Sequence, residues 1–177
     1  MEAALHASQQ LAQALGAVVG GGDVPTVPAL YLDYLPPELR GAPKDFFVYR
    51  MDILAIAAAG GAGNGAFTVQ SDSDFLITSI AAAVTDPAAP QTAVAPNGLT
   101  LELTDTGAGR NFQNGQLAFD TVVGTGQLPG YLPWPKFIDR ASQVTGTVVN
   151  NQAAQAVDVR ISFLGFKIFS PNQAGLR

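Results

Sequence analysis

The sequence predicts an all-β fold: a single β-sandwich or jelly-roll domain of about seven or eight strands, with an N-terminal helix and a proline-rich extended arm. Three observations predict it. Short stretches of alternating apolar and polar residues recur along most of the chain. Glycine and proline, with 19 and 12 residues, place turn signals between these stretches. After residue 45 no segment keeps a helical period over three turns, which disfavours alternating strands and helices.

The sequence predicts an appendage at residues 1–45 and a β domain at residues 46–177. Residues 3–19 predict a short helix, because their leucines and valines fall near one face, and the glycines at 20–22 end it. Five prolines between 23 and 45 predict an extended arm with no helix or central strand. This arm is apolar and needs another surface to lie on. The side chains expected to contact a partner are Leu5, Leu11 and Leu15 in the helix, and Leu30, Tyr31, Leu32, Tyr34 and Leu35 in the arm.

The β domain begins with a long strand candidate at 46–59, in which Phe47, Tyr49, Met51 and Ile53 occupy one face. Its glycine-rich continuation at 60–65 predicts a hairpin turn. Residues 85–98, 105–110 and 124–137 predict turns or irregular connections. The remaining strands are predicted at 66–71, 75–84, 99–104, 117–123, 143–150 and 156–169.

Composition argues against several classes of function. The net charge is −5 and the nine basic residues are scattered, which is unlike a nucleic-acid-binding surface. No apolar run approaches the length of a membrane span, so no membrane partner is expected. The chain has no cysteine, which removes thiolate metal sites and cysteine nucleophiles. Charged residues are 13% and apolar residues 47%, a balance typical of a protein whose surface is partly covered by partners.

Catalytic and cofactor patterns are missing from the sequence. The single histidine, His6, lies in the predicted helix, far from any acidic cluster. Asp72 and Asp74 offer oxygen ligands of the kind calcium takes, but they lack the spacing of an EF-hand loop, and a solvated turn fits better. Whether this pair binds an ion is left open. The glycine run at 60–65 is followed by neither GK[ST] nor a helix, so it does not predict a phosphate site. We therefore expect no enzyme, no cofactor and no metal ion.

Trp134 lies between Pro133 and Pro135 and allows two interpretations. With Tyr131 it would form a stacking platform for a ligand. Alternatively, the prolines fix a tight bend and the ring plugs the edge of the sandwich core, which fits the sequence better.

Several stretches resemble small head-associated virion structural proteins of tailed phages. They are the run from Phe67 to Phe75, the segment LTLELTDTGAGR at 99–110, the sequence LPWP at 132–135 and the closing QVTGTVVNNQAAQAVDVRISFLGFKI at 143–168. The resemblance covers residues 46–169 and consists of strand-and-turn patterns rather than catalytic signatures. It implies a β-sandwich virion component of the decoration or cement type, forming dimers or trimers, with no catalytic residues.

The resulting hypothesis is a capsid decoration or cement protein on the exterior of a phage particle, which binds the major capsid protein and other virion proteins. The alternative is a tail-fibre or head–tail module that recognises a receptor or glycan through Tyr131 and Trp134. A virion hydrolase using a carboxylate pair is the third possibility, disfavoured by the single histidine and the absence of cysteine. A major capsid protein is disfavoured because the chain lacks the long helix usual in the tailed-phage shell fold.

Overall fold

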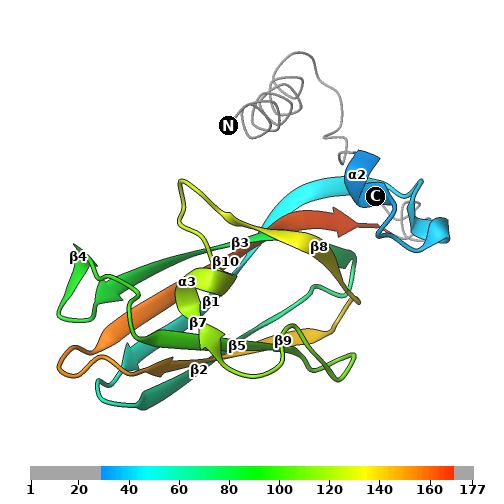
Figure 1. Cartoon of the computed structure of the whole chain (residues 1–177). Coiled ribbons are helices and arrows are strands. Elements are labelled where there is room, and N and C mark those ends of the chain that lie inside the picture. Colours follow the sequence, from blue (N-terminus) through cyan, green and yellow to red (C-terminus); the bar gives the residue numbers. More distant parts are fainter. Residues whose placement is uncertain (1–28, 170–177) are drawn as a thin grey trace.

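A computed structural model describes residues 29–169, which form two five-stranded antiparallel sheets packed face to face (Figure 1). The predicted all-β sandwich is confirmed, but the described residues contain ten strands rather than the expected seven or eight. The predicted helix at 3–19, with Leu5, Leu11 and Leu15, lies outside the described residues. The strands are β1 (Lys44–Ile56), β2 (Gly61–Thr68), β3 (Asp74–Asp86), β4 (Ala89–Ala93), β5 (Leu99–Asp105), β6 (Arg110–Asn111), β7 (Leu117–Ala118), β8 (Gly130–Ile138), β9 (Gln143–Asn150) and β10 (Val157–Ile168).

The strands pair in a nested order. In one sheet β1 pairs with β10, β10 with β3, and β3 with both β4 and β8. In the other, β2 pairs with β9, β9 with β5, and β5 with both β6 and β7. The first three strands therefore pair with the last three: β1 with β10, β2 with β9, and β3 with β8.

The core between the sheets comes from the alternation in the strand sequences. Tyr49, Met51 and Ile53 of β1 are buried, as the sequence predicts, and leucines 99, 101 and 103 of β5 face them from the other sheet. On β10 the alternate residues Val157, Val159, Ile161 and Phe163 are all fully buried. Residues of opposite polarity thus sort to opposite faces because successive strand side chains point to opposite sides.

The glycine-rich turn predicted at 60–65 is wrong, because Gly61–Thr68 is strand β2 and the turn precedes it. Gly60 supplies the turn with a positive φ of 91°. Gly63 and Gly65 serve close packing instead. A Cβ on Gly65 would lie 2.7 Å from Cγ1 of Ile53, and one on Gly63 would lie 2.6 Å from Cγ2 of the same residue. Glycine here allows β2 to approach β1 closely.

Three other local predictions need correction. The loop predicted at 85–98 contains the short strand β4. The strand predicted at 117–123 is only β7 followed by the helical turn α3 (Phe119–Val122), because the buried residues Phe119 and Val123 are spaced by one helical turn. The irregular connection predicted at 124–137 contains β8, an edge strand in which prolines are tolerated because the sheet ends there.

The arm is not extended throughout, contrary to the prediction. It contains the helical turn α2 (Ala29–Leu32) and the 3-10 turn η1 (Pro37–Leu39), and Pro37 fits the first position of its turn because it needs no N–H partner there. Leu35 and Ala42 pack against Leu76 and Ile168 on the outer face of the β1–β10–β3 sheet. The surface on which this part of the arm lies is therefore its own domain. The boundary placed between residues 45 and 46 stays a prediction.

Within residues 29–169, no helix has the length and apolar character needed to cross a membrane.

Candidate functional site

The LPWP sequence interrupts the pairing of β8 with β3. Lys136 lies opposite Ile77, and the next paired residue on β8 is Tyr131, opposite Ser79. Residues 132–135 of β8 are therefore unpaired. Over the same stretch β3 advances only from Ile77 to Ser79. Pro133 and Pro135 have no N–H to donate to a ladder, so the sequence favours this bulge. The bulge turns Trp134 away from the core.

Trp134 is 69% exposed and Tyr131 is 55% exposed, so the interpretation of Trp134 as a core plug is wrong. The ring of Tyr34, from the arm, meets the Trp134 ring edge to face at a centroid distance of 6.0 Å. Tyr31 lies beside them. Its pKa is raised above the ordinary value of 10.0, chiefly by burial and further by the neighbouring Tyr131 and Tyr34. We call Tyr31, Tyr34, Tyr131 and Trp134 the aromatic patch.

The aromatic patch concentrates a scarce residue class. The chain has one tryptophan and four tyrosines, and the patch holds the tryptophan and three of the tyrosines. Its members come from α2 with the following turn and from β8, about a hundred residues apart in sequence. Exposed aromatic rings with polar edges are enriched where proteins bind partners, because each buries much area at small entropic cost.

An open groove of about 360 Å³ begins next to the patch, at Tyr131. Its walls are largely apolar, with Phe112, Leu117 and Leu132 among them, and Lys136 and Asp120 supply charge. The Lys136 ammonium lies 5.9 Å from the centroid of the Phe112 ring, within the range of a cation–π contact. Apolar walls with a few polar groups are the usual make-up of small-ligand sites.

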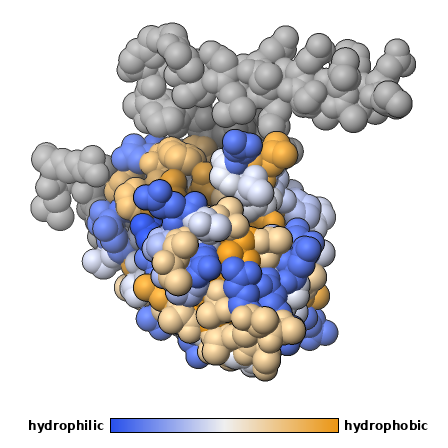
Figure 2. Space-filling view, turned by 90° about the vertical axis from the view of Figure 1, so that its left-hand side faces the viewer, coloured by the Kyte–Doolittle hydropathy of each residue, from blue (hydrophilic) through white to orange (hydrophobic). Residues whose placement is uncertain are grey.

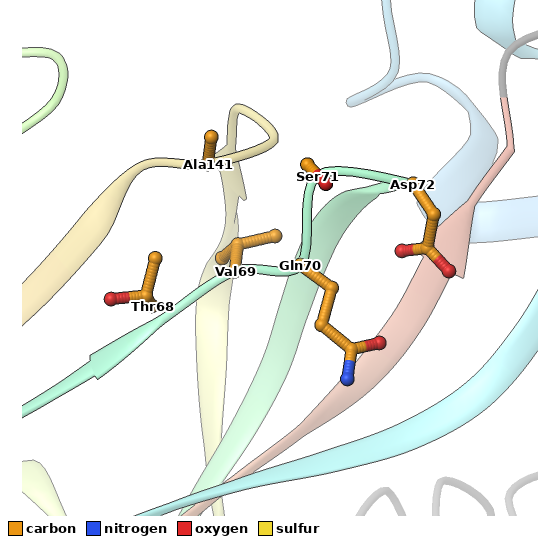
Figure 3. Close-up of a pocket in the computed structure, with 6 residues that line it drawn as sticks. All are labelled: Thr68, Val69, Gln70, Ser71, Asp72 and Ala141. Atoms are coloured by element: carbon orange, nitrogen blue, oxygen red, sulfur yellow. The ribbon is translucent and has the colours of Figure 1, made fainter.

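A second hollow, of about 570 Å³ and widely open, lies at the corner between β2 and β3 (Figure 3). Behind it the Lys167 ammonium is buried, donates to Oε1 of Gln70, lies 3.7 Å from Oδ1 of Asp72 and sits 4.3 Å from the Phe47 ring centroid. The Gln70 N–H donates to the Tyr49 hydroxyl at 2.9 Å. Burial is the main cause that raises the pKa of Tyr49, with Asp72 adding to it and the Gln70 hydrogen bond opposing it. The polar groups at this corner are engaged with each other, which favours a structural role.

Asp74 is held by Arg140 rather than exposed in a solvated turn. The residue is 4% exposed, and its carboxylate accepts hydrogen bonds from the Arg140 backbone N–H at 2.9 Å, Nε at 3.1 Å and Nη2 at 3.0 Å. Asp72 accepts from the Ser73 hydroxyl at 2.9 Å and faces Lys167. Among the described residues, no group of three or more histidine, cysteine, aspartate or glutamate side chains is placed to hold a metal ion. The carboxylates of Asp74 and Asp72 are already paired with Arg140 and Lys167.

The end of the sandwich opposite the arm offers a different surface (Figure 2). Apolar residues, in tan and orange, lie there among hydrophilic ones in blue. The exposed positions here include Ala57, Ala59 and Ala88 in loops and Ala89 at the start of β4. Small side chains bury little area each, so these alanines offer less binding area than the aromatic patch.

No family model matches the chain, and no curated protein matches it. Among solved structures, the chain is similar to one in the cryo-EM structure of the virus-like particle of the giant freshwater prawn (Macrobrachium rosenbergii) extra small virus. The two are 17% identical, the TM-score is 0.29, and the match covers 80% of this chain and 86% of that one. At so low a TM-score the two chains are not shown to share a fold.

The structure joins two residue sets that the sequence assigned to different functions. The sequence assigns Tyr31 and Tyr34 to a capsid contact, and Tyr131 and Trp134 to a ligand platform. In the structure these four residues form one patch. Leu35 is not part of the patch, because its side chain is only 2% exposed and packs between the arm and the sheet. Leu32 is partly buried against the same cluster. For Leu30 only the backbone, in α2, is described. Sequence reasoning missed the groove, whose lining comes from β3, β5, α3 and β8 and shares no local motif.

Proposed function

We propose that this protein is a virion structural component that decorates or cements a capsid from the outside, and that the aromatic patch is its main contact with the major capsid protein. The exposed rings of Tyr131 and Trp134, together with the half-buried Tyr34, carry this proposal. The nested strand order supports it as an analogy of fold, since it is the connectivity of a jelly roll, an architecture found in capsid and lectin domains.

The patch has the properties of a hot spot for binding. Tryptophan and tyrosine dominate the energetics of protein interfaces when a partner excludes water from them. Tyr34 already braces Trp134, which reduces the side-chain freedom that binding would remove. The ion pair between Arg40 and Asp33 lies at 3.9 Å on the exposed arm nearby and would stand at the rim. Binding of this kind stabilises a lattice by burial alone and needs no catalytic step.

The test is co-sedimentation of the full chain with empty particles of the capsid that it decorates. Trp134→Ala should weaken binding at least about tenfold, the effect of losing a central aromatic anchor. Leu128→Ala is the matched control, because Leu128 is 78% exposed and outside the patch. Undiminished binding by Trp134→Ala together with Tyr131→Ala would rule out the patch as the contact.

The groove beside Tyr131 supports a second candidate, recognition of a glycan or another small receptor group by a tail-fibre or head–tail module. Sugars stack on exposed aromatic rings, and Asp120, Lys136 and Gln113 stand near enough to the wall to donate or accept hydrogen bonds. A glycan array with the unmodified chain and with Trp134→Ala distinguishes the candidates. Glycan binding that depends on Trp134, without binding to particles, would replace the capsid proposal with this one.

A further inference from the structure

We propose that two copies of this chain pair edge to edge through β1, in an antiparallel, twofold arrangement with Met51 of each copy at the axis. This inference is independent of the aromatic patch and of its partner. It rests on three observations: the open edge of β1, the protection of most other sheet edges, and the self-complementary order of the side chains on β1.

The backbone of β1 has one side without a strand. Within the described residues β1 pairs with β10 and with no other strand. The carbonyl of Pro43 accepts from the Phe169 N–H at 3.0 Å, and these residues lie one position beyond the pair Lys44–Ile168, with which the β1–β10 register begins. Because hydrogen-bonded pairs alternate along an antiparallel ladder, the odd-numbered residues of β1 bond to β10. The even-numbered ones, Phe46, Val48, Arg50 and Asp52, direct their N–H and C=O groups away from it.

Most of the other edges are protected in ways that proteins commonly use. β8 carries Pro133 and Pro135, and β4 carries Pro90. β6 and β7 have two residues each. β2 is open, but glycine and alanine make up most of its sequence, and such strands specify their register weakly. β1 has 13 residues without proline, and its register with β10 is regular from Lys44 to Ile53.

The exposed side chains of β1 complement a second copy of themselves. The outward face carries Val48 (42% exposed), then Arg50 and Asp52, then Leu54 (58% exposed). An antiparallel pair centred on Met51 sets Arg50 opposite Asp52 of the second copy, and Val48 opposite Leu54 of the second copy. Each contact occurs twice because of the twofold axis. Opposite charges and apolar pairs directly across a ladder are both favourable.

The arrangement also fits the existing sheet. Arg50 and Asp52 already form an ion pair of 2.7 Å within the strand, and Asp52 lies opposite Arg160 in the β10 register. Asp52 would then stand between Arg160 of its own chain and Arg50 of the second copy. Charges usually keep a sheet edge from pairing, but here they alternate in sign and so select this register instead.

Light scattering of the full chain over a concentration series tests the proposal. We expect a mass of two copies of the 18.3 kDa chain. Val48→Pro should give the monomer, because it removes an outward N–H and leaves every β1–β10 hydrogen bond intact. Val48→Thr, which keeps the N–H and the β-branched shape, is the matched control and should remain dimeric.

Charge reversal tests the register. Asp52→Arg should weaken the dimer by about ten- to a hundredfold, since it sets like charges opposite each other twice. The exchange Arg50→Asp with Asp52→Arg should restore most of the affinity. Glu102→Arg, the same change of charge on the other sheet, should have no effect. Circular dichroism checks that each variant is folded.

A chain that stays monomeric at all concentrations, a trimer, or a dimer that survives Val48→Pro would overturn the proposal. A dimer lost in Asp52→Arg and not recovered by the exchange would overturn the register. Trp134→Ala should leave the dimer intact, so failure of this proposal and failure of the capsid contact are distinguishable.

Discussion

Large apolar side chains cluster in two regions, between the sheets and at the arm end of the molecule. The two regions differ in how completely these side chains are buried. Between the sheets, residues such as Phe75 and Phe163 are covered on every side and are fully buried. At the arm end, Leu35, Ala42, Leu76 and Ile168 form a small buried cluster. In the aromatic patch beside it, Tyr31 and Tyr34 are partly buried, and Tyr131 and Trp134 are exposed. Two facing sheets bury each other's side chains, whereas a single short arm covers only part of an outer face.

The comparison indicates a division of roles. The sandwich accounts for most of the buried apolar area, so it should determine whether the chain folds. The arm adds little to that total but positions Tyr34 against Trp134. Variants in the two regions should therefore differ in the size and the cooperativity of their effects.

The largest effect is expected for Phe163→Ala, at about 3–5 kcal/mol of lost unfolding free energy, because a fully buried aromatic leaves a cavity. Phe163 also packs on Phe67 with a centroid distance of 4.7 Å. Phe46→Ala is the control, since Phe46 is 52% exposed on an adjacent strand, and it should cost about 1 kcal/mol or less. Urea denaturation measures both; similar losses would show that the two positions are equally covered in solution.

Leu35→Ala should cost about 2–3 kcal/mol, at the low end for a buried leucine, because the cluster under the arm is small. We expect local rather than global unfolding. Amide exchange should accelerate in residues 31–43 and stay slow in β5 and β9, and the fluorescence of the sole tryptophan should change as Tyr34 leaves it. Equal acceleration in the sheets would mean that arm and sandwich unfold as one unit.

Gly65→Ala should cost about 1–2 kcal/mol by overpacking the sandwich at its β1–β2 side. The new methyl would lie 2.7 Å from Ile53 Cγ1, 2.8 Å from Met51 Cγ and 3.0 Å from the Asp52 carbonyl oxygen. Gly126→Ala is the control, because nothing lies within 4 Å of the added carbon. Thermal denaturation compares the two variants, and an unchanged midpoint for Gly65→Ala would show that β2 can move away from β1.

The smallest effect concerns alkaline pH at the arm end. The pKa of Tyr31 is raised by burial and by Tyr131 and Tyr34, so the unfolded chain loses this proton first. The stabilisation is complete below pH 10.0 and is lost as the pH rises through the folded-state value. Burial lowers the pKa of Lys44 below 10.5, so this residue opposes the trend as the pH rises toward that value. Tyr31→Phe should lessen the alkaline loss in urea titrations on either side of pH 10.0; an unchanged loss would assign it to other groups.

Local sequence predicted the strands with strict alternation and failed where packing or proline decided the structure. The predicted 99–104 and 143–150 match β5 and β9 closely, because one face of each is buried. The glycine-rich start of β2, residues 61–65, was missed, and only its last three residues fall in the predicted strand 66–71. The glycines allow β2 to approach β1, a contact between sheets that no turn signal reveals. β8 was missed because its prolines indicate an irregular connection, although prolines are also tolerated in an edge strand.

The sequence identified the residues of the candidate site but did not show that they lie together. Sequence reasoning chose all four aromatic residues of the patch but split them between two hypotheses. Their proximity depends on Leu35 docking over Leu76 and Ile168, a contact between distant segments. The buried charges were missed as well: Asp74 with Arg140, Lys167 at the β2–β3 corner, and Lys44, which donates to the carbonyls of Arg40 and Ala42.

The nested strand order has a consequence for how the protein is made. Among the strands that the structure describes, β1 is synthesised first, and its partner β10 emerges last. A growing chain on the ribosome therefore carries β1 and β2 unpaired until β9 and β10 appear, and folding must wait for the most distant contacts. Since β10 lies between β1 and β3, a nascent chain halted before Val157 would lack the centre of one sheet. The sandwich can therefore close only after β10 has been synthesised, and a chaperone that shields unpaired strands would act before that step.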